Sequence, residues 1–427
     1  MRDEVTEIEE RVLNAIDIDG MLKYLCEIIA VPSYGGNETA AQKNIAAKMR
    51  EIGFEVETWE IDFHELSKHP KFSMSIDREE GLDVVGTIGE KRGGRDLILN
   101  GHIDTVAPGD EDNWSYPPLE GTITDGRVYG RGACDMKGGL CCAIYAAKAI
   151  LDAGVQLKGE LMIESVIGEE DGGAGALAAV LRGYTADGAV VMEPSETKIA
   201  PVHAGALSFR VTVPGKSAHA CVREEGVSAI EKFMLIHEAL RVLEDERNRN
   251  VDDPLYSRYK IPYALNIGTV HGGNWPGSVA ESLAFEGRIG VAVGEKVEEA
   301  RQRFEETIKK VALADPWLRD HPPTVEWRGY QFDPGRIPLE EPIVKTVTEA
   351  YADATGKVAQ LEGMTYASDM RHLINTGETP TLIFGPGDVR NAHSPNEYVL
   401  VEELVAVARS LALTILRFCG YETHKKS

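Results

Sequence analysis

The stretch Leu97-Ile98-Leu99-Asn100-Gly101-His102-Ile103-Asp104 decides how the fold of this chain is interpreted. A short apolar run ends there in a glycine and is followed at once by a histidine and an aspartate, two residue types that bind metals. Three other apolar runs end in the same way: residues 161–167 precede Glu169 and Glu170, residues 189–192 precede Glu193, and residues 381–384 precede a loop that leads to His393. Short apolar runs of this kind predict buried strands.

Helical segments alternate with these strands. A helix over residues 40–49, capped by Asn37 and ended by Gly53, precedes a strand at 54–59. A second helix is expected from about 137 to 153, and a third at 342–355 is ended by Gly356. This order predicts an α/β catalytic domain whose mixed sheet is covered by helices on both faces.

The middle of the chain has a different order of elements. Strands are expected at 207–213, 265–270, 283–293 and 324–332, with helices at 227–243 and 296–311. The order β-α-β-β-α-β is that of a ferredoxin-like α+β domain. We therefore expect a catalytic domain made of residues 1–203 and 333–427, interrupted by an inserted lid and dimerisation domain at 204–332. Hinges are expected near Ala204 and Phe332.

Composition excludes several classes of protein. The 427 residues carry a net charge of −24 and no basic stripe, which argues against a nucleic-acid partner. No apolar run is long enough to span a bilayer, and the acidic start lacks the pattern of a secretion signal. The six cysteines show no disulfide or zinc-knuckle spacing. We expect a reduced, cytoplasmic protein with no membrane partner.

The polar residues after the strands predict a metal centre. Ligands gather beyond the carboxyl ends of parallel strands, so these side chains are expected in one crevice. Asp135, in the glycine-rich segment 130–139, is a further candidate. Histidine and carboxylate ligands suit zinc, with cobalt or manganese as alternatives. Five ligands exceed what one catalytic zinc needs, so we expect two divalent cations that share one carboxylate.

Spacing in the sequence also suggests roles for Asp104, Glu169 and Glu170. Asp104 lies two residues from His102 and is expected to hydrogen-bond its other ring nitrogen. Glu169 and Glu170 are adjacent, and neighbouring side chains in an extended segment diverge. One of the two is expected to bind metal while the other acts as a general base. Alone, such a pair is usually a solvated surface; the joint occurrence of all these motifs favours a site.

At these motifs the chain resembles the family that contains acetylornithine deacetylase, succinyl-diaminopimelate desuccinylase, aminoacylase and the glutamate-releasing carboxypeptidases. The resemblance runs from about residue 30 to the C-terminal helix. It rests on five motifs: Gly101 to Asp104, Gly130 to Gly139, Gly168 to Glu170, Met192 to Pro194, and Gly385 to His393.

The resemblance assigns the metal ligands. It implies that Asp135 bridges two metals, with His102 and Glu193 completing one site and Glu170 and His393 the other. It also implies a cis peptide bond between Asp135 and Met136.

The resemblance also implies the catalytic groups. Glu169 would be the general base, and Asp104 would orient His102. The inserted domain would pair two subunits into a homodimer, in which His219 would reach the neighbouring subunit's site and donate to the oxyanion.

Substrate contacts are implied at Asn274, Arg288, Arg371 and Gly385. Both arginines lie where the family often places one for a substrate carboxylate, although a structural ion pair is an equal alternative for each. The lid segment departs from the family pattern, because Ala280 stands where proline is common.

The function expected from these residues is metal-dependent hydrolysis of a linear amide, with an N-acyl amino acid or a related small molecule as substrate. Glu193 favours N-acyl substrates, because acylases and carboxypeptidases of the family tend to have glutamate there. The alternatives are a deformylase of an N-formyl aminopyrimidine and a dipeptidase or carboxypeptidase. Outside the enzymes, a metal-dependent binding protein and a structural dimer with surface acids remain as alternatives.

Overall fold

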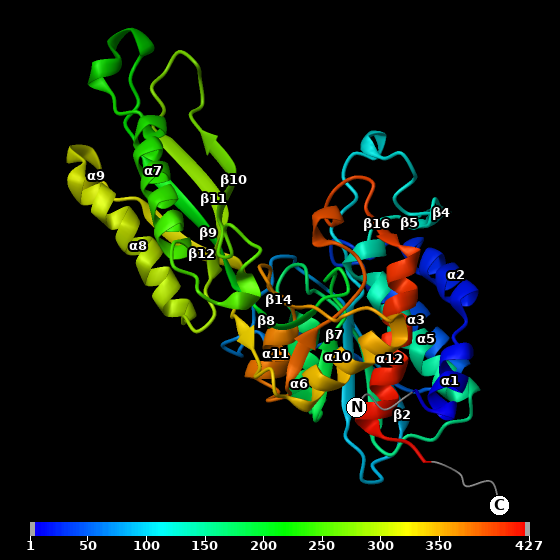
Figure 1. The fold of residues 1–427 in the computed structure, drawn as a ribbon. Coiled ribbons are helices and arrows are strands. Elements are labelled where there is room, and N and C mark those ends of the chain that lie inside the picture. Colours follow the sequence, from blue (N-terminus) through cyan, green and yellow to red (C-terminus); the bar gives the residue numbers. More distant parts are fainter. Residues whose placement is uncertain (1–4, 423–427) are drawn as a thin grey trace, which may run out of the picture. The chain divides into compact units, whose positions relative to one another are not determined.

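The computed structural model describes residues 5–422, which divide into two compact units (Figure 1). The first unit holds the chain up to Val202, Arg336–Glu362, and the chain from Ser368 onward. The second holds His203–Gly335 and the short segment Gly363–Ala367. Each unit is described below on its own.

A nine-stranded mixed sheet organises the first unit. Its strands run in the order β1 (Glu55–Glu60), β2 (Leu82–Gly89), β6 (Glu160–Val166), β3 (Leu97–His102), β7 (Gly188–Val191), β15 (Thr381–Ile383), β8 (Ile199–His203) and β13 (Gly335–Arg336), with β14 (Leu361–Met364) paired to β8.

The centre of this sheet is parallel. β3 pairs in parallel with β6 on one side and β7 on the other, and β7 pairs in parallel with β15. All four strands therefore end at the same edge of the sheet, and the four predicted ligand-bearing loops leave from that edge. The apolar runs that predict these strands are fully buried at β3 and β7.

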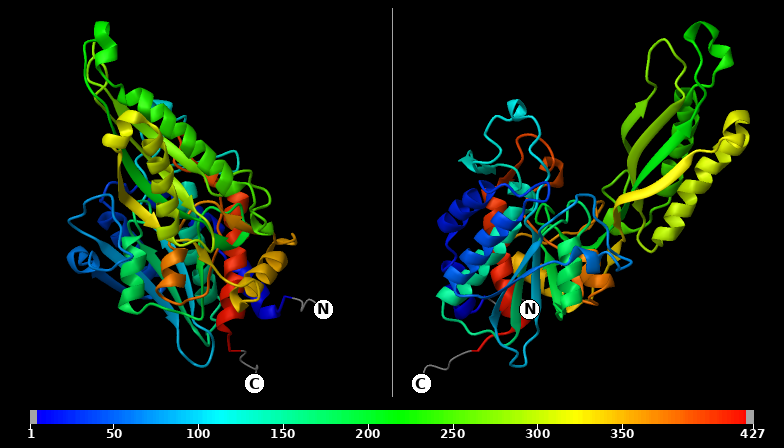
Figure 2. Two further views of the ribbon diagram at one scale, coloured as in Figure 1. Left: turned by 90° about the vertical axis from the view of Figure 1, so that its left-hand side faces the viewer. Right: turned by 180° about the vertical axis from the view of Figure 1, so that it is seen from behind.

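Helices cover both faces of the sheet, as Figures 1 and 2 show. One face packs against α5 (Gly138–Asp152), α12 (Val401–Cys419), α10 (Pro342–Thr355) and α3 (Thr39–Ile52), and α2 (Ile18–Ile29) packs on α5 and α3; α6 (Ala174–Arg182) and α11 (Met370–Asn375) pack on the other face. The predicted α/β class is confirmed.

The start of α3 differs from the prediction. Glu38, not Asn37, occupies the N-cap position, and no side chain caps the helix. The Asn37 amide donates instead to the Tyr34 carbonyl at 3.3 Å. The predicted end is confirmed, because Gly53 has a φ of 110°, which glycine adopts without steric cost.

The second unit contains a four-stranded antiparallel sheet in the order β10 (Leu265–Gly272), β11 (Ser282–Val291), β9 (Gly205–Pro214) and β12 (Thr324–Phe332). The helices α7 (Ala229–Asn248), α8 (Val297–Ala314) and α9 (Pro316–Asp320) lie on one face of it (Figure 1). Phe209, Phe285 and Phe304 form the centre of its core. The predicted ferredoxin-like order of elements is present, and β10 lies at an edge.

The remaining elements are short or peripheral. A three-stranded sheet is formed by β16 (Tyr398–Leu400), β5 (Arg127–Tyr129) and β4 (Thr122–Thr124), and two further helices are α1 (Glu7–Asn14) and α4 (Phe63–Leu66). Five short helical turns span 111–113, 133–137, 220–225, 254–256 and 389–391. Across residues 5–422, no helix combines the length and the apolar character that crossing a membrane requires.

Candidate metal centre

Two groups of metal-type side chains lie together in the first unit. His102, Asp135 and Glu193 form one group, and Asp135, Glu170 and His393 form the other. Within each group the ligand atoms lie within 4.8 Å of one another. The five residues come from five separate segments of the sequence, and Asp135 belongs to both groups.

The imidazole of His102 is held with one nitrogen facing the carboxylates. Its Nδ1 lies 2.9 Å from the carbonyl oxygen of Asp104, so a neutral ring donates through Nδ1. Its Nε2, which then carries the lone pair, lies 3.1 Å from Oδ1 of Asp135 and 3.7 Å from Oε1 of Glu193. The His102 nitrogen and the two carboxylate oxygens are all acceptors, so they need a proton or a cation between them. This geometry fits a metal ligand.

Asp135 presents its two oxygens to different histidines. Oδ1 faces His102, whereas Oδ2 lies 3.4 Å from Nε2 of His393. His393 Nε2 is also 2.9 Å from Oε2 of Glu170. Burial alone would raise the pKa of Asp135, but the two histidines hold it below its ordinary value. The same hydrogen bonds, to Asp135 and Glu170, raise the pKa of His393 to about 11.

The segment that carries Asp135 enters α5 through the turn at 133–137. The peptide bond between Asp135 and Met136 is cis, as the family resemblance implies. Oε1 of Glu397 accepts from the backbone N–H groups of Cys134 and Asp135 at 3.0 and 3.1 Å. No role for Glu397 was predicted from the sequence.

Glu169 and Glu170 lie in a tight turn and not in the extended segment that the sequence suggested. The N–H of Gly173 donates to the carbonyl of Gly168 at 2.6 Å and closes the turn. The Asp104 carboxylate accepts from the N–H groups of Glu169 and Glu170, at 3.3 and 3.1 Å. Asp104 therefore meets His102 Nδ1 mainly through its carbonyl, because its carboxylate, at 3.6 Å from that nitrogen, binds this turn.

Glu170 joins the metal-type group, whereas Glu169 does not. The Glu169 side chain is buried, and among the described residues its Oε1 has no hydrogen-bond partner. Burial and the neighbouring carboxylate of Glu193 raise the pKa of Glu169. A buried carboxylate whose affinity for protons is raised in this way suits a group that accepts and returns a proton.

The charge at this edge of the sheet favours cations. Asp104, Asp135, Glu169, Glu170 and Glu193 are all largely withdrawn from solvent. Within residues 5–422, no lysine or arginine forms an ion pair with any of them. Buried carboxylates without a cation are costly. Nitrogen and oxygen donors in two groups around one aspartate fit two divalent metal ions.

A buried ion-pair network supports the turn. Arg78 contacts Glu38 at 3.0 Å and Asp171 at 2.8 Å, and all three side chains are at most 5% exposed. Asp171 follows Glu170 directly and also accepts from the N–H groups of Ser75 and Ile76. No sequence pattern pointed to Arg78, which lies in an irregular segment outside the motifs.

Two predicted substrate contacts of the first unit have structural partners. Arg371 is buried, and its Nη2 donates to the carbonyl of Gly172 at 2.7 Å. Gly385 packs closely against the segment of Glu193, because a Cβ at Gly385 would lie 2.4 Å from the carbonyl oxygens of Met192 and Glu193. Their contact with a substrate stays a prediction.

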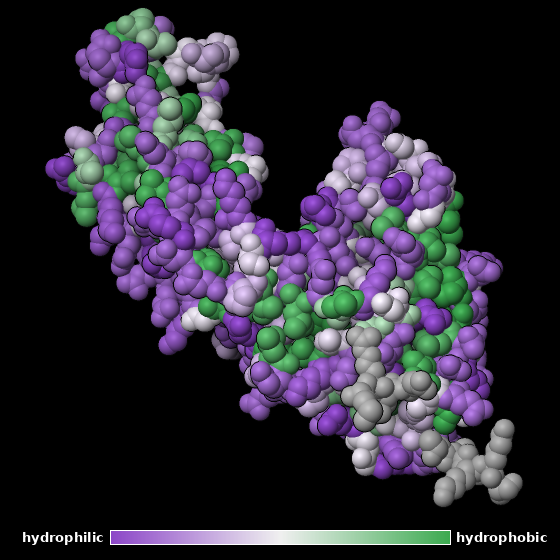
Figure 3. All heavy atoms as spheres, viewed as in Figure 1, coloured by the Kyte–Doolittle hydropathy of each residue, from purple (hydrophilic) through white to green (hydrophobic). Residues whose placement is uncertain are grey.

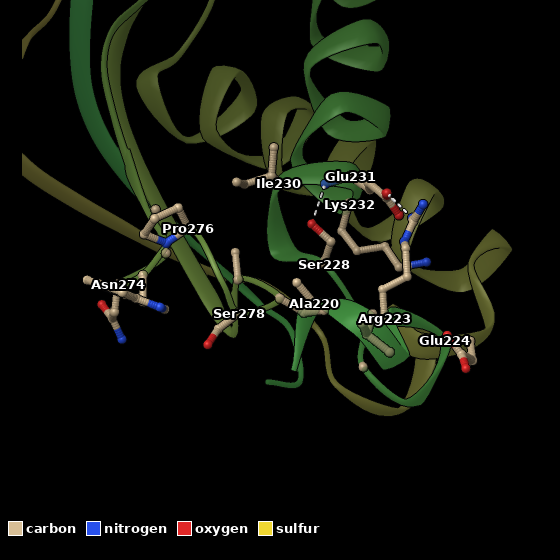
Figure 4. Close-up of a pocket in the computed structure, with 17 residues that line it drawn as sticks. Ala220, Arg223, Glu224, Ser228, Ile230, Glu231, Lys232, Asn274, Pro276 and Ser278 are labelled. Atoms are coloured by element: carbon tan, nitrogen blue, oxygen red, sulfur yellow. Dashed lines mark hydrogen bonds and ion pairs between the residues drawn. The ribbon is translucent and has the colours of Figure 1, made fainter. Parts of the chain in front are cut away.

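The other predicted residues lie in the second unit. His219 Nδ1 accepts from the N–H of Cys221 at 3.2 Å. Arg288 donates to the Thr365 carbonyl at 3.4 Å. Asn274 contacts Glu281 and helps to line a cavity of about 960 Å³ at the start of α7 (Figure 4). This cavity contains neither of the two metal-type groups.

Comparisons with known proteins agree on one family. A model described as peptidase family M20/M25/M40 matches residues 98–417. The chain is 32% identical over 407 residues to an N-formyl-4-amino-5-aminomethyl-2-methylpyrimidine deformylase of Halalkalibacterium halodurans, with 91% of each chain covered. It is 27% identical to a protein of the same name from Bacillus subtilis, with 90% of each covered.

Solved structures share the fold. A dipeptidase from Saccharomyces cerevisiae matches with a TM-score of 0.76 at 14% identity, covering 98% of this chain and 99% of the other. A tripeptidase from Staphylococcus aureus matches with a TM-score of 0.72 at 22% identity, covering 95% and 99%. At these identities the likeness concerns the fold alone.

Proposed function

Since this chain belongs to the peptidase family M20/M25/M40 of metallo-hydrolases, we propose that it hydrolyses the formyl amide of an N-formyl aminomethylpyrimidine. The observation that carries the proposal is the 32% identity with a deformylase of that substrate over 91% of both chains. The sequence motifs favoured an N-acyl amino acid and held the formyl aminopyrimidine as an alternative. The relatives support the alternative better.

The side chains at the edge of the main sheet suit this reaction. His102, Asp135 and Glu193 would hold one divalent cation, and Asp135, Glu170 and His393 the other, with zinc as the first choice. When bound, the cations would polarise the amide carbonyl and acidify the attacking water.

Glu169 is proposed as the general base. Its buried Oε1, which has no hydrogen-bond partner within residues 5–422, would take a proton from water and later deliver it to the nitrogen of the leaving amine. The Asp104 carboxylate would keep the turn that carries Glu169 in place, through the N–H groups of residues 169 and 170.

His219 is proposed as a donor to the oxyanion in the neighbouring subunit's site. Because its Nδ1 accepts from the Cys221 N–H, a neutral ring carries its proton on Nε2 and presents a donor there. We expect His219→Ala to lower kcat by more than it raises KM, since an oxyanion contact strengthens in the transition state. Equal kcat values for the variant and the wild type would remove this role.

A substrate panel tests the proposed substrate. Matched N-formyl and N-acetyl aminomethylpyrimidines, N-acetyl and N-succinyl amino acids, and dipeptides would be assayed for release of the free amine. A pocket that discriminates by one methyl group should favour the formyl compound about 10- to 200-fold in kcat/KM. Faster turnover of an N-acyl amino acid would return the assignment to the deacylases, and preference for a dipeptide would make the chain a peptidase.

We also propose that the chain forms a homodimer through its second unit. Among the described residues β10 is an edge strand of its sheet, and an edge strand presents backbone N–H and C=O groups on its outer side. Beside it, α7 exposes Met234 and Ile230, and β10 exposes Val270. Figure 3 shows hydrophobic residues among hydrophilic ones on the surface of this unit. Exposed apolar groups next to an open strand edge suit pairing with a second copy.

Light scattering after size-exclusion chromatography tests the dimer. Met234→Glu and Val270→Lys should each shift the mass from two chains towards one, because they place a charge at the proposed interface. Val358→Glu, at an exposed apolar position of the first unit, is the control and should leave the mass unchanged. A wild-type mass of one chain would contradict the proposal.

A further inference from the structure

Glu397 gathers three donors from one loop. The residue lies four positions after His393 and is 1% exposed. Its Oε1 accepts from the N–H groups of Cys134 and Asp135, and its Oε2 accepts from Nη1 of Arg131 at 2.5 Å. A single buried carboxylate therefore binds the segment from residue 131 to residue 135 at three points.

Other contacts fix the ends of the same segment. The N–H of Gly130 donates to the carbonyl of Glu397 at 3.0 Å. The buried ammonium of Lys137 donates to the carbonyls of Ile28 and Val31 at 3.0 and 3.1 Å. These contacts hold the segment at residues 130 and 137. Between them, the two hydrogen bonds to Oε1 of Glu397 are the contacts that hold the backbone at Cys134 and Asp135.

The two carboxylate oxygens of Glu397 have different partners, so its contact with the backbone can be distinguished from its ion pair with Arg131. Arg131 uses Oε2, so the ion pair does not require Oε1 to point at the backbone of Cys134 and Asp135. The side chain of Asp135 leaves the very residue whose N–H is held. A shift of that peptide would turn both carboxylate oxygens away from His102 and His393.

We propose that Glu397 is a positioning residue for the metal centre. By holding the N–H groups of Cys134 and Asp135, its carboxylate directs the two oxygens of Asp135 towards the two histidines. The loop at residues 393–397 thus supplies His393 as a ligand and Glu397 as the residue that positions Asp135, which both groups share. This inference rests on the proposed metal centre, and it predicts that both cation sites depend on Glu397 together.

Cobalt titration of the full-length, chelator-treated chain tests the inference without any substrate. Partners of metal ligands typically contribute 10- to 100-fold in affinity. Glu397→Gln keeps an oxygen for the two N–H groups, so we expect affinity for Co²⁺ to fall about 10-fold. Glu397→Leu removes that oxygen, and we expect a loss of about 100-fold at both sites.

Glu9 supplies a matched control. It is also a buried glutamate that accepts from an arginine, Arg417 at 2.8 Å, and from a backbone N–H, that of Thr6 at 2.8 Å. Glu9→Gln and Glu9→Leu should lower thermal stability and leave cobalt affinity unchanged. If the Glu397 variants lose stability as the Glu9 variants do but bind two Co²⁺ with wild-type affinity, the inference is overturned.

Three other outcomes are decisive. If Glu397→Leu does not fold, the 10-fold loss expected for Glu397→Gln decides alone. Weakening of one cobalt site without the other would contradict positioning through the shared Asp135. A wild-type chain that binds two Co²⁺ but leaves every formyl compound intact would remove the proposed substrate alone, and the cobalt affinities of the Glu397 variants would still decide this inference.

Discussion

Replacing Arg78 by methionine tests the support beneath the proposed general base. The guanidinium contacts Glu38 at 3.0 Å and Asp171 at 2.8 Å, and all three side chains are at most 5% exposed. Methionine has similar length but leaves two buried carboxylates without their cation. Breaking a buried ion pair by removing one partner costs about 3–5 kcal/mol. We expect Arg78→Met to lower the free energy of unfolding by that amount.

The assay is urea unfolding at neutral pH, with Arg210→Met as the matched control. Arg210 pairs with Glu286 at 2.6 Å, but both side chains are more than a third exposed, so its loss should cost about 1 kcal/mol or less. Arg78→Met should also lower kcat, because Asp171 follows Glu169 and Glu170 directly. Equal losses of stability for the two arginines would refute the reasoning from burial.

Three further predictions concern single residues. Glu169→Gln should keep its metal content, as measured by elemental analysis, while kcat/KM falls about 10²- to 10⁴-fold; turnover near the wild-type rate would end its role as base. Gly385→Ala should cost about 1–3 kcal/mol in urea unfolding, because the new Cβ would lie 2.4 Å from the carbonyl oxygen of Glu193; unchanged stability would contradict this packing. Burial would raise the pKa of Glu295, but the ion pair with Arg247 at 2.7 Å lowers it. The pair therefore stabilises the folded chain at any pH above the pKa that this carboxyl has in the unfolded chain. That stabilisation is lost as the pH falls through the lower pKa of the folded state. Glu295→Gln should therefore lower the urea midpoint at neutral pH and less in acid, and an equal loss at every pH would contradict this sign.

The five metal-type residues were predictable because strand periodicity and topology place them. His102, Glu170 and Glu193 follow parallel strands that are neighbours in the sheet, so all three residues leave the same edge of the sheet close to one another. His393 and Asp135 lie on longer loops. They were recognised through the glycine-rich motifs and the family resemblance, and not through periodicity.

Side-chain direction was harder to predict. Asp104 was expected to hydrogen-bond His102 and does so, but through its carbonyl, because its carboxylate accepts from the turn at Glu169 and Glu170. Spacing in the sequence gives proximity, whereas the choice between carbonyl and carboxylate depends on which donors the tertiary fold brings near. The helix cap expected from Asn37 is not formed, because the side-chain amide of Asn37 donates to the Tyr34 carbonyl.

Buried ion pairs were the least predictable feature. Arg78 and Glu38 are 40 residues apart and lie outside every motif, so no pattern in the sequence joins them. Arg371 was expected either to bind substrate or to serve a structural role; the structure shows a buried side chain that donates to the carbonyl of Gly172.

The most direct test is anomalous diffraction at the zinc absorption edge from crystals of the wild-type chain grown with zinc. We expect two zinc peaks, one beside each oxygen of Asp135, with His102 and Glu193 around one and Glu170 and His393 around the other. A single peak, or peaks remote from Asp135, would contradict the claim that one aspartate is shared by a pair of cations.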